Sequence, residues 1–311
     1  MIKKILVPLD RSELAEQALP IATTLASRTE ARIALAAVVV PGEFWSGDRD
    51  PIIWQQADEA AALRYLEKVE EDVLGKGVVA RGRVACGPAA MTLSRFADEE
   101  DADLIVMSTH GRAGFSRWIM GSVADKLLHI TTRPILLVRA TDDAAARRPA
   151  RLERILVPLD GSAHSESVLP FVEDLAGQLG ASLVLQQAVL PVTLFAGEYI
   201  PPTESLQEPA ASAHEYLGRI AARERSLGIA ADVEVDVGAS ADAILHAAKR
   251  SGADVIALST HGWSGPLRWV LGSVADAVVR HSPLPVLVIP GKAVTERGKD
   301  AAPKIVEDAR T

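Results

Sequence analysis

The sequence predicts an α/β protein built from two tandem copies of one domain, each a parallel sheet with helices on both faces. Two matches indicate the duplication: 4–12 (KILVPLDRS) with 154–162 (RILVPLDGS), and 108–125 with 259–276, which share Ser-Thr-His-Gly and Gly-Ser-Val-Ala-Asp. The offsets are 150 (154 minus 4) and 151 (259 minus 108), so the repeating unit is a whole domain. Within each copy, apolar β-prone runs alternate with helical stretches, which is typical of a parallel sheet.

The elements of the first copy follow from local patterns. Residues 5–9 form an apolar run stopped by Asp10, which predicts a strand buried on both faces, and Ser12 can then cap a helix to about residue 28. The alternation goes on with strand 32–40, helix 57–75, strand 78–85, helix 89–100, strand 104–107, helix 122–130 and strand 135–138. The second copy repeats this pattern from residue 155 to residue 288.

Length and composition fit two soluble domains. We place the boundaries as follows: domain 1 at residues 1–140, a polar linker at 141–152, domain 2 at 153–291 and a charged tail at 292–311. The formal net charge of −8 argues against nucleic acid and anionic membranes as partners. A signal peptide and an apolar run of about 18 residues are both missing, so the expected location is the cytoplasm. The one cysteine, Cys86, cannot form an intramolecular disulfide.

The predicted strand ends carry the candidate binding residues. Ligands of open parallel sheets bind outside the carboxyl ends of strands, where the strand order reverses. Asp10 and Asp160 end the first strand of each copy, and Ser108 and Ser259 end the fourth. If the order is 3-2-1-4-5, as in flavodoxin-like sheets, these two strands are neighbours. Each aspartate can accept hydrogen bonds from a ribose or a base, hold Mg²⁺, or cap the following helix, and these roles can coexist.

The loop after the fourth strand is a candidate phosphate site. Gly111 and Gly121 let backbone amides approach an anion, and Ser122 begins a helix whose first N–H groups favour negative charge. Ser122 with Asp125 resembles a capping box, so Asp125 is expected to cap. The alternative is that the glycines only shape a turn and the serine only caps a helix. Repetition of the loop in both copies, with the same spacing, favours the phosphate site.

These motifs together resemble the universal stress protein family in its tandem two-domain form. The resemblance rests on Val-Pro-Leu-Asp, on Gly-x9-Gly-Ser and on the closing strand Pro-Ile-Leu-Leu-Val, and it covers about residues 2–139 and 153–290. It implies two flavodoxin/Rossmann-like domains, each with a five-stranded parallel sheet of order 3-2-1-4-5. It also implies ATP as ligand, with Mg²⁺ as an optional companion. The residues that it assigns to ATP are Pro8, Leu9, Asp10, Val38, Ser108, Gly111, Gly121, Ser122 and Val123 in the first copy, and Pro158, Leu159, Asp160, Ala188, Ser259, Gly262, Gly272, Ser273 and Val274 in the second.

One departure from the family pattern bears on ATP binding. ATP-binding members carry Gly-x2-Gly-x9-Gly-[Ser/Thr], whereas the first glycine is Ser108 in one copy and Ser259 in the other. A serine side chain there either clashes with the ribose or donates a hydrogen bond to it. The resemblance further implies that the fifth strands, 135–138 and 285–288, pair within the chain as a built-in dimer; whole-chain homodimers are also common in the family.

Three functions are compatible with these residues. The first is an ATP-binding regulator of the stress response that acts on an unidentified protein partner. The second is a slow ATPase or nucleotidyl transferase, against which the chain lacks a Gly-x4-Gly-Lys-[Ser/Thr] P-loop. The third is an interaction module that binds no nucleotide. His110 and His261 have no ligand cluster at metal spacing, so we predict no catalytic and no metal-binding residue.

Overall fold

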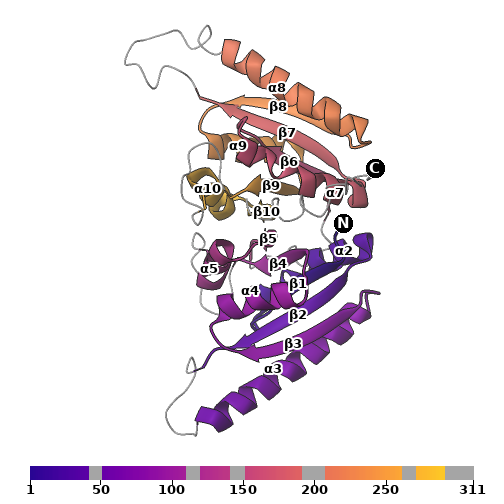
Figure 1. Ribbon diagram of the computed structural model, residues 1–311, viewed down its shortest axis with the longest axis vertical. Coiled ribbons are helices and arrows are strands. Elements are labelled where there is room, and N and C mark those ends of the chain that lie inside the picture. The colour runs from indigo at the N-terminus through magenta and orange to yellow at the C-terminus, as the bar shows by residue number, and fades with distance from the viewer. Residues whose placement is uncertain (42–50, 110–119, 141–150, 191–206, 261–270, 291–311) are drawn as a thin grey trace, which may run out of the picture.

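Both copies contribute to a single ten-stranded sheet. The computed structural model describes residues 1–41, 51–109, 120–140, 151–190, 207–260 and 271–290, but not the side chains of Pro51, Trp54 and Gln207. The strand order is β3-β2-β1-β4-β5-β10-β9-β6-β7-β8 (Figure 1). The strands are β1 Lys4–Pro8, β2 Arg32–Val39, β3 Ala80–Cys86, β4 Leu104–Ser108, β5 Ile135–Val138, β6 Arg154–Pro158, β7 Ser182–Val189, β8 Ala231–Val237, β9 Val255–Ser259 and β10 Val286–Ile289. The helices are α1 Glu13–Glu16, α2 Leu19–Thr29, α3 Pro51–Leu74, α4 Ala89–Glu99, α5 Ser122–Ile130, α6 Ala163–Glu166, α7 Leu169–Leu179, α8 Gln207–Ser226, α9 Ser240–Ser251 and α10 Ser273–His281.

Each half has the predicted strand order. β3, β2, β1, β4 and β5 are all parallel, and their counterparts in the second half are parallel to one another. The order 3-2-1-4-5 is therefore confirmed in both copies. β5 and β10 join the halves by antiparallel pairing, with Leu136 opposite Leu287. The predicted pairing of the fifth strands is thus present.

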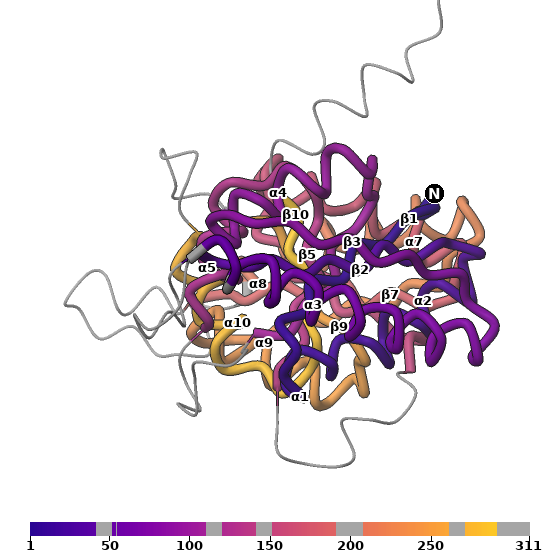
Figure 2. Tube along the Cα trace, turned by 90° about the horizontal axis from the view of Figure 1, so that it is seen from below, coloured from indigo at the N-terminus to yellow at the C-terminus, as the bar shows by residue number. Residues whose placement is uncertain are grey.

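The sheet is buried on both sides. One side, which we call the α2 face, packs against α2, α3, α7 and α8; the other, the α5 face, packs against α4, α5, α9 and α10. In Figure 2, α3 and α4 lie on opposite sides of β2 and β3. Successive side chains of β1 alternate between the faces: Ile5 and Val7 belong to the α2 face and Leu6 to the α5 face.

The helix predicted from Ser12 to about residue 28 is wrong as one element. It is divided into α1 and α2, because Gln17 and Ala18 donate to carbonyls three residues back, at 3.3 and 3.2 Å. Pro20 explains the break: it has no N–H to donate to the carbonyl of Glu16, and its ring would clash with that carbonyl in a continuous helix. At the start of a new helix the same proline is favourable.

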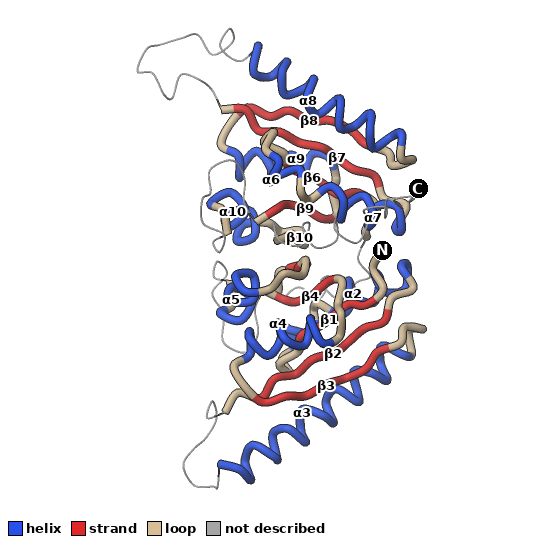
Figure 3. Tube along the Cα trace, viewed as in Figure 1, coloured by secondary structure: helices blue, strands red, loops and turns tan. Residues whose placement is uncertain are grey.

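The two longest helices, α3 and α8, lie along the outer strands of the sheet (Figure 3). α3 begins at Pro51, six residues before the predicted Ala57 (57 minus 51), since proline suits a first helical position. None of the helices in the described ranges combines the length with the apolar run that crossing a bilayer requires.

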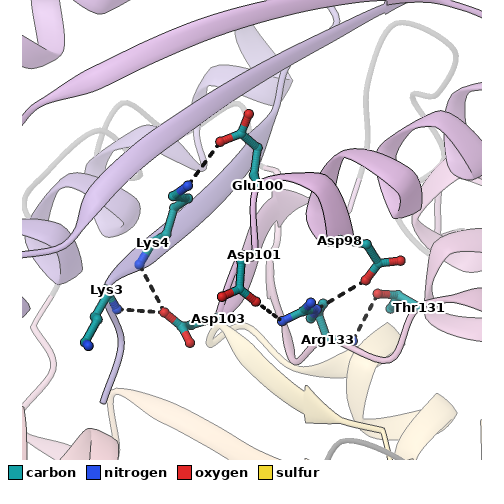
Figure 4. A network of polar contacts seen from close by, with 8 residues as sticks. All are labelled: Lys3, Lys4, Asp98, Glu100, Asp101, Asp103, Thr131 and Arg133. Atoms are coloured by element: carbon teal, nitrogen blue, oxygen red, sulfur yellow. Dashed lines mark hydrogen bonds and ion pairs between the residues drawn. The ribbon is translucent and has the colours of Figure 1, made fainter.

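Polar contacts tie down the amino ends of β1 and β4 (Figure 4). Oδ2 of Asp103 accepts hydrogen bonds from the backbone N–H groups of Lys3, at 2.8 Å, and Lys4, at 3.1 Å. Asp254 repeats this in the second half, accepting from Glu153 at 2.9 Å and Arg154 at 3.1 Å. These contacts thus fix β1 against β4, and β6 against β9, at the edge of the sheet opposite the candidate site.

Candidate functional site

The switch point of the first half lies at the carboxyl ends of β1 and β4, and we call the region outside these ends the crevice. In the parallel register Leu6 is opposite Ile105, so Asp10 and Thr109, each four residues further on, leave the sheet at the same level. The strand order reverses between these two strands, which is the place where such sheets bind ligands. The second half repeats the arrangement with Leu156, Ile256, Asp160 and Thr260.

Asp10 organises the turn that leaves β1. Its Oδ1 accepts hydrogen bonds from the N–H of Ser12 at 3.0 Å and from the Ser12 hydroxyl at 2.5 Å. The Ser12 hydroxyl oxygen in turn accepts from the N–H of Ala15 at 3.1 Å and so caps α1. Asp160, Ser162 and Ser165 form the same chain of contacts, at 3.0, 2.6 and 3.1 Å. The predicted capping role of the aspartates is therefore wrong, because Ser12 and Ser162 are the N-caps of α1 and α6. Each aspartate instead holds the capping serine and has a fixed orientation at the crevice.

The predicted ATP-binding residues at the ends of the first two strands lie on different faces of the sheet, because successive side chains of a strand alternate between the faces. Val38 packs against the core of the α5 face, whereas Leu9 is buried in the core of the α2 face. Pro8 lies between Val7 and Leu9 in the strand, so it is on the α5 face. Leu9 can therefore reach the crevice only through its backbone carbonyl, because its N–H donates to Ala36 at 2.8 Å. The second half matches: Leu159 is in the α2-face core, and Pro158 and the half-buried Ala188 occupy the equivalent positions.

Ser108 and Ser259 point away from the α5 face. In β4, Leu104 and Val106 belong to the α2 face and Ile105 and Met107 to the α5 face, so Ser108 continues the α2-face row. β9 has the same alternation up to Ser259. The serine that replaces the first motif glycine is therefore directed toward the side of α1 and α6, away from α5 and α10.

The N-termini of α5 and α10 border the crevices on the α5 face. Gly121 is the N-cap of α5, with φ −59° and ψ 142°, and its N–H donates to the carbonyl of Thr109 at 2.7 Å. The first intrahelical bond is from Asp125 to Gly121, at 3.0 Å, so the N–H groups of Ser122, Val123 and Ala124 have no intrahelical acceptor. Gly272, Thr260 and Asp276 repeat these bonds, at 2.7 and 2.8 Å. Ser273 and Val274 open the second helix in the same way.

The expected capping box at Ser122 and Asp125 is wrong. The N-cap is Gly121, which has no side chain, and α5 has no side-chain cap. Gly121 has a negative φ, so this position does not require positive φ. Its N–H is already bonded to Thr109, which leaves the next three amides to meet an anion.

Several predicted positions lie outside the described residues. They are Gly111, Gly262, His110, His261, most of the 141–152 linker and the tail 292–311. Within the described ranges, no group of three His, Cys, Asp or Glu side chains is arranged to hold a metal ion.

Two tyrosines that the sequence did not single out anchor the turns beside the crevices. The hydroxyl of Tyr65 on α3 donates to Oε1 of Glu16 at 2.9 Å, and that of Tyr216 on α8 donates to Oε1 of Glu166 at 2.9 Å. Burial and then the neighbouring Glu166 carboxylate raise the pKa of Tyr216 well above its ordinary value. Recurrence of tyrosine at an offset of 151 and of glutamate at 150 was the available signal.

Comparisons with known proteins agree with this architecture. A family model described as the universal stress protein family matches residues 1–139 and 151–290. A universal stress protein of Mycolicibacterium smegmatis is 28% identical over 298 residues, which cover 92% of this chain and 96% of that protein. Universal stress protein YxiE of Bacillus subtilis is 29% identical over 154 residues, covering 45% of this chain and all of that shorter protein (100%).

A solved structure has the same fold over nearly the whole chain. The crystal structure of a universal stress protein from Archaeoglobus fulgidus superposes with a TM-score of 0.68 at 21% identity. It covers 93% of this chain and 98% of that one. The duplicated 3-2-1-4-5 sheet, the repeated turns at its carboxyl edge and the two family matches lead to one conclusion: the chain belongs to the universal stress protein family, with two family domains in tandem.

Proposed function

We propose that each half binds one ATP in its crevice, and that nucleotide occupancy regulates a protein partner in the stress response. The observation that carries the proposal is the repeated juxtaposition at the switch point. A fixed aspartate follows β1 or β6 in the turn after the strand, and three helix amides without an intrahelical acceptor open α5 or α10 beside the neighbouring strand. Membership in the universal stress protein family supports the stress-response role.

The chemistry of the crevice suits a nucleotide. Amides at a helix N-terminus and the helix dipole favour the negative charge of a phosphate. Pro8 and Val38 offer apolar surface on the same face, where a base would be shielded from water. Because Ser108 is directed to the other face, its hydroxyl does not obstruct that surface. Mg²⁺ would be held mainly by the phosphates, as this ion usually is in nucleotide sites.

The first test is to denature freshly purified protein and to identify the released nucleotide by mass and absorbance. We expect two molecules of ATP per chain, one for each half. Absence of nucleotide, together with no heat when ATP and Mg²⁺ are titrated into the protein, would refute ATP binding.

A substitution at the first residue of α5 tests the role of the amides. Ser122→Pro removes one N–H, yet proline is tolerated at a first helical position, and the extended ψ of 142° at Gly121 suits a residue before proline. We expect Ser122→Pro to halve the ATP bound per chain, and Ser273→Pro added to it to remove the rest. The matched control, Ser122→Ala, removes only the hydroxyl and should keep both sites; equal stoichiometry in the proline and alanine variants would contradict the role of the amides.

A further inference from the structure

The second half contains a pocket on the α2 face, beside its crevice. Its volume is about 510 Å³, within the range of small-molecule sites. It is bounded by the turn after β6 at Gly161, by the end of β7 at Gln187 and Val189, and by α8 at Pro209 and Tyr216. We call it the α8 pocket.

The α8 pocket and the α10 N-terminus are on opposite sides of the sheet. α8 covers the α2 face, and Val189 belongs to the core of that face. Gly272 precedes α10, which covers the α5 face. A ligand in the α8 pocket would therefore be separated by the sheet from phosphates at α10, although Ala188 contributes to both surroundings.

The first half bridges the corresponding space with its own side chains. Arg11 is the counterpart of Gly161, at an offset of 150, and Asp58 is the counterpart of Pro209, at 151, the offset that also relates Tyr65 to Tyr216. The Arg11 guanidinium forms a two-point ion pair with Asp58, with Nη1–Oδ1 at 2.6 Å and Nη2–Oδ2 at 3.0 Å. These side chains are only 22% and 18% exposed, so the pair packs between the β1 turn and α3. In the second half a Cβ at Gly161 would meet nothing within 4 Å.

The backbone at Gly161 is unstrained, whereas the backbone at its counterpart Arg11 is strained. Arg11 holds a left-handed φ of 69°, which costs a non-glycine residue about 1 kcal/mol. Gly161 has φ 82°, where glycine is unstrained. The first half thus has a strained backbone where it places a guanidinium, whereas no described residue of the second half fills the space beside Gly161.

The lining of the α8 pocket contains an acceptor that lacks a donor. Among the described residues, the buried Oε1 of Gln187 has no hydrogen-bond partner, although it belongs to a side chain that lines the pocket. A buried acceptor of this kind costs about 1–3 kcal/mol until an N–H or O–H group reaches it. The counterpart in the first half is Ala37, whose side chain has no hydrogen-bonding group.

The surrounding charges favour an uncharged occupant. The carboxylates of Asp160 and Glu166 act on the Tyr216 hydroxyl at the inner side of the pocket, which disfavours an anion. Arg219 lies at the rim, where it pairs with Glu215 at 2.9 Å, and it disfavours a cation. Pro209 stands where the first half has the acidic counter-ion Asp58, so a cation would also lack that partner.

We propose that the α8 pocket is a binding site for a small uncharged ring compound with a carboxamide or lactam group, whose N–H donates to Gln187 Oε1. The pocket is distinct from the ATP crevices, and the Arg11–Asp58 ion pair bridges the corresponding place in the first half, so we expect one molecule per chain.

Nicotinamide is a suitable probe, because nicotinate has the same ring with a carboxylate in place of the carboxamide. We would measure both by ligand-observed saturation-transfer NMR on the full chain, with methylguanidinium as the cationic comparison. Nicotinamide should bind at least about tenfold more tightly than either ion, which corresponds to about 1.4 kcal/mol. Equal affinity for nicotinamide and nicotinate would overturn the proposal.

Two variants locate the binding. Gly161→Arg with Pro209→Asp transplants the ion pair of the first half and should abolish the nicotinamide signal. Gln187→Ala copies Ala37 and should weaken binding about tenfold while leaving the backbone of the turn untouched. Unchanged nicotinamide binding in either variant would refute the site, and circular dichroism at increasing temperature checks that both variants are folded.

ATP stoichiometry in the same variants separates this proposal from the proposed function. The double variant Gly161→Arg with Pro209→Asp should still bind two molecules of ATP per chain, because neither residue is predicted to contact ATP. If the unsubstituted chain binds no ATP, the proposed function is refuted, whereas the nicotinamide measurement still decides whether the α8 pocket is a binding site.

Discussion

A buried carboxyl distinguishes the core of the second half from that of the first. Glu224 on α8 is fully buried, and no described residue donates a hydrogen bond of good geometry to its carboxylate oxygens. The first half has Val73 at this position, and both residues accept the same helix-ending bond, from Val78 and Ile229. Burial and then the nearby Glu173 on α7 raise the pKa of Glu224 to about 7, while Arg223 opposes the shift.

The raised pKa predicts how stability depends on pH. The folded chain holds this proton more tightly than the unfolded chain, in which the pKa is near 4.5, so stability falls as pH rises from about 4.5 to about 7. The loss should approach about 3 kcal/mol. Glu224→Val, which copies Val73, should remove this part of the pH dependence and raise the free energy of unfolding most at pH 8. Urea denaturation at pH 5 and pH 8 measures both.

A matched control isolates the buried position. Glu67 on α3 is exposed, so Glu67→Val should change the free energy of unfolding by a similar small amount at both pH values. If the gap between Glu224→Val and the unsubstituted chain is the same at pH 5 and pH 8, Glu224 does not titrate as inferred.

At the scale of elements, the sequence predicted nearly every strand but fewer helix boundaries. Apolar runs such as Ile5 to Leu9 predicted strands buried on both faces, and the expected order 3-2-1-4-5 made β1 and β4 neighbours, as they are. Their register was not predicted. The break before α2 and the early start of α3 both depend on a proline, whose effect is local and was outweighed in our prediction by the hydrophobic period. The direction of Ser108 could not be predicted, because it depends on which strand residues face α5.

The hydrogen bonds of Asp103 at the amino ends of β1 and β4 give a prediction for the stability of this strand pair. Asp103→Ala removes the acceptor of two backbone N–H groups at the start of β1 and should cost about 1–3 kcal/mol of unfolding free energy. Asp98→Ala is the control, since its side chain is 61% exposed and pairs only at the surface with Arg133 (Figure 4). Thermal or urea unfolding measures the difference; equal losses would mean that Asp103 is replaceable by water.

At the scale of the whole molecule, the two halves are one folded body. β5 and β10 make the sheet continuous, and Arg28 of α2 donates to the carbonyls of Leu152 and Leu179 in the second half. Contacts between α2 and α7 extend this junction along the α2 face. The duplication therefore buries two sheet edges that separate domains would expose.

A double-mutant cycle measures the coupling across this junction. Leu136 and Leu287 are opposite each other and buried, so Leu136→Ala and Leu287→Ala together should differ from the sum of the single losses by about 0.5–3 kcal/mol. Leu66 on α3 is remote from the junction, and its cycle with Leu287 should be additive within about 0.5 kcal/mol. Additive losses for the opposed pair would show that the two side chains are not coupled across the junction.

Because the two domains are part of one chain, a mutation can change one domain without changing the other. In a dimer of identical subunits every substitution appears twice, once on each side of the symmetry axis. In this chain each copy is encoded separately, so Arg11 and Val73 can be kept in one half while glycine and glutamate occupy the same places in the other. The antiparallel β5–β10 pairing thus preserves a symmetric scaffold while allowing its two halves to differ.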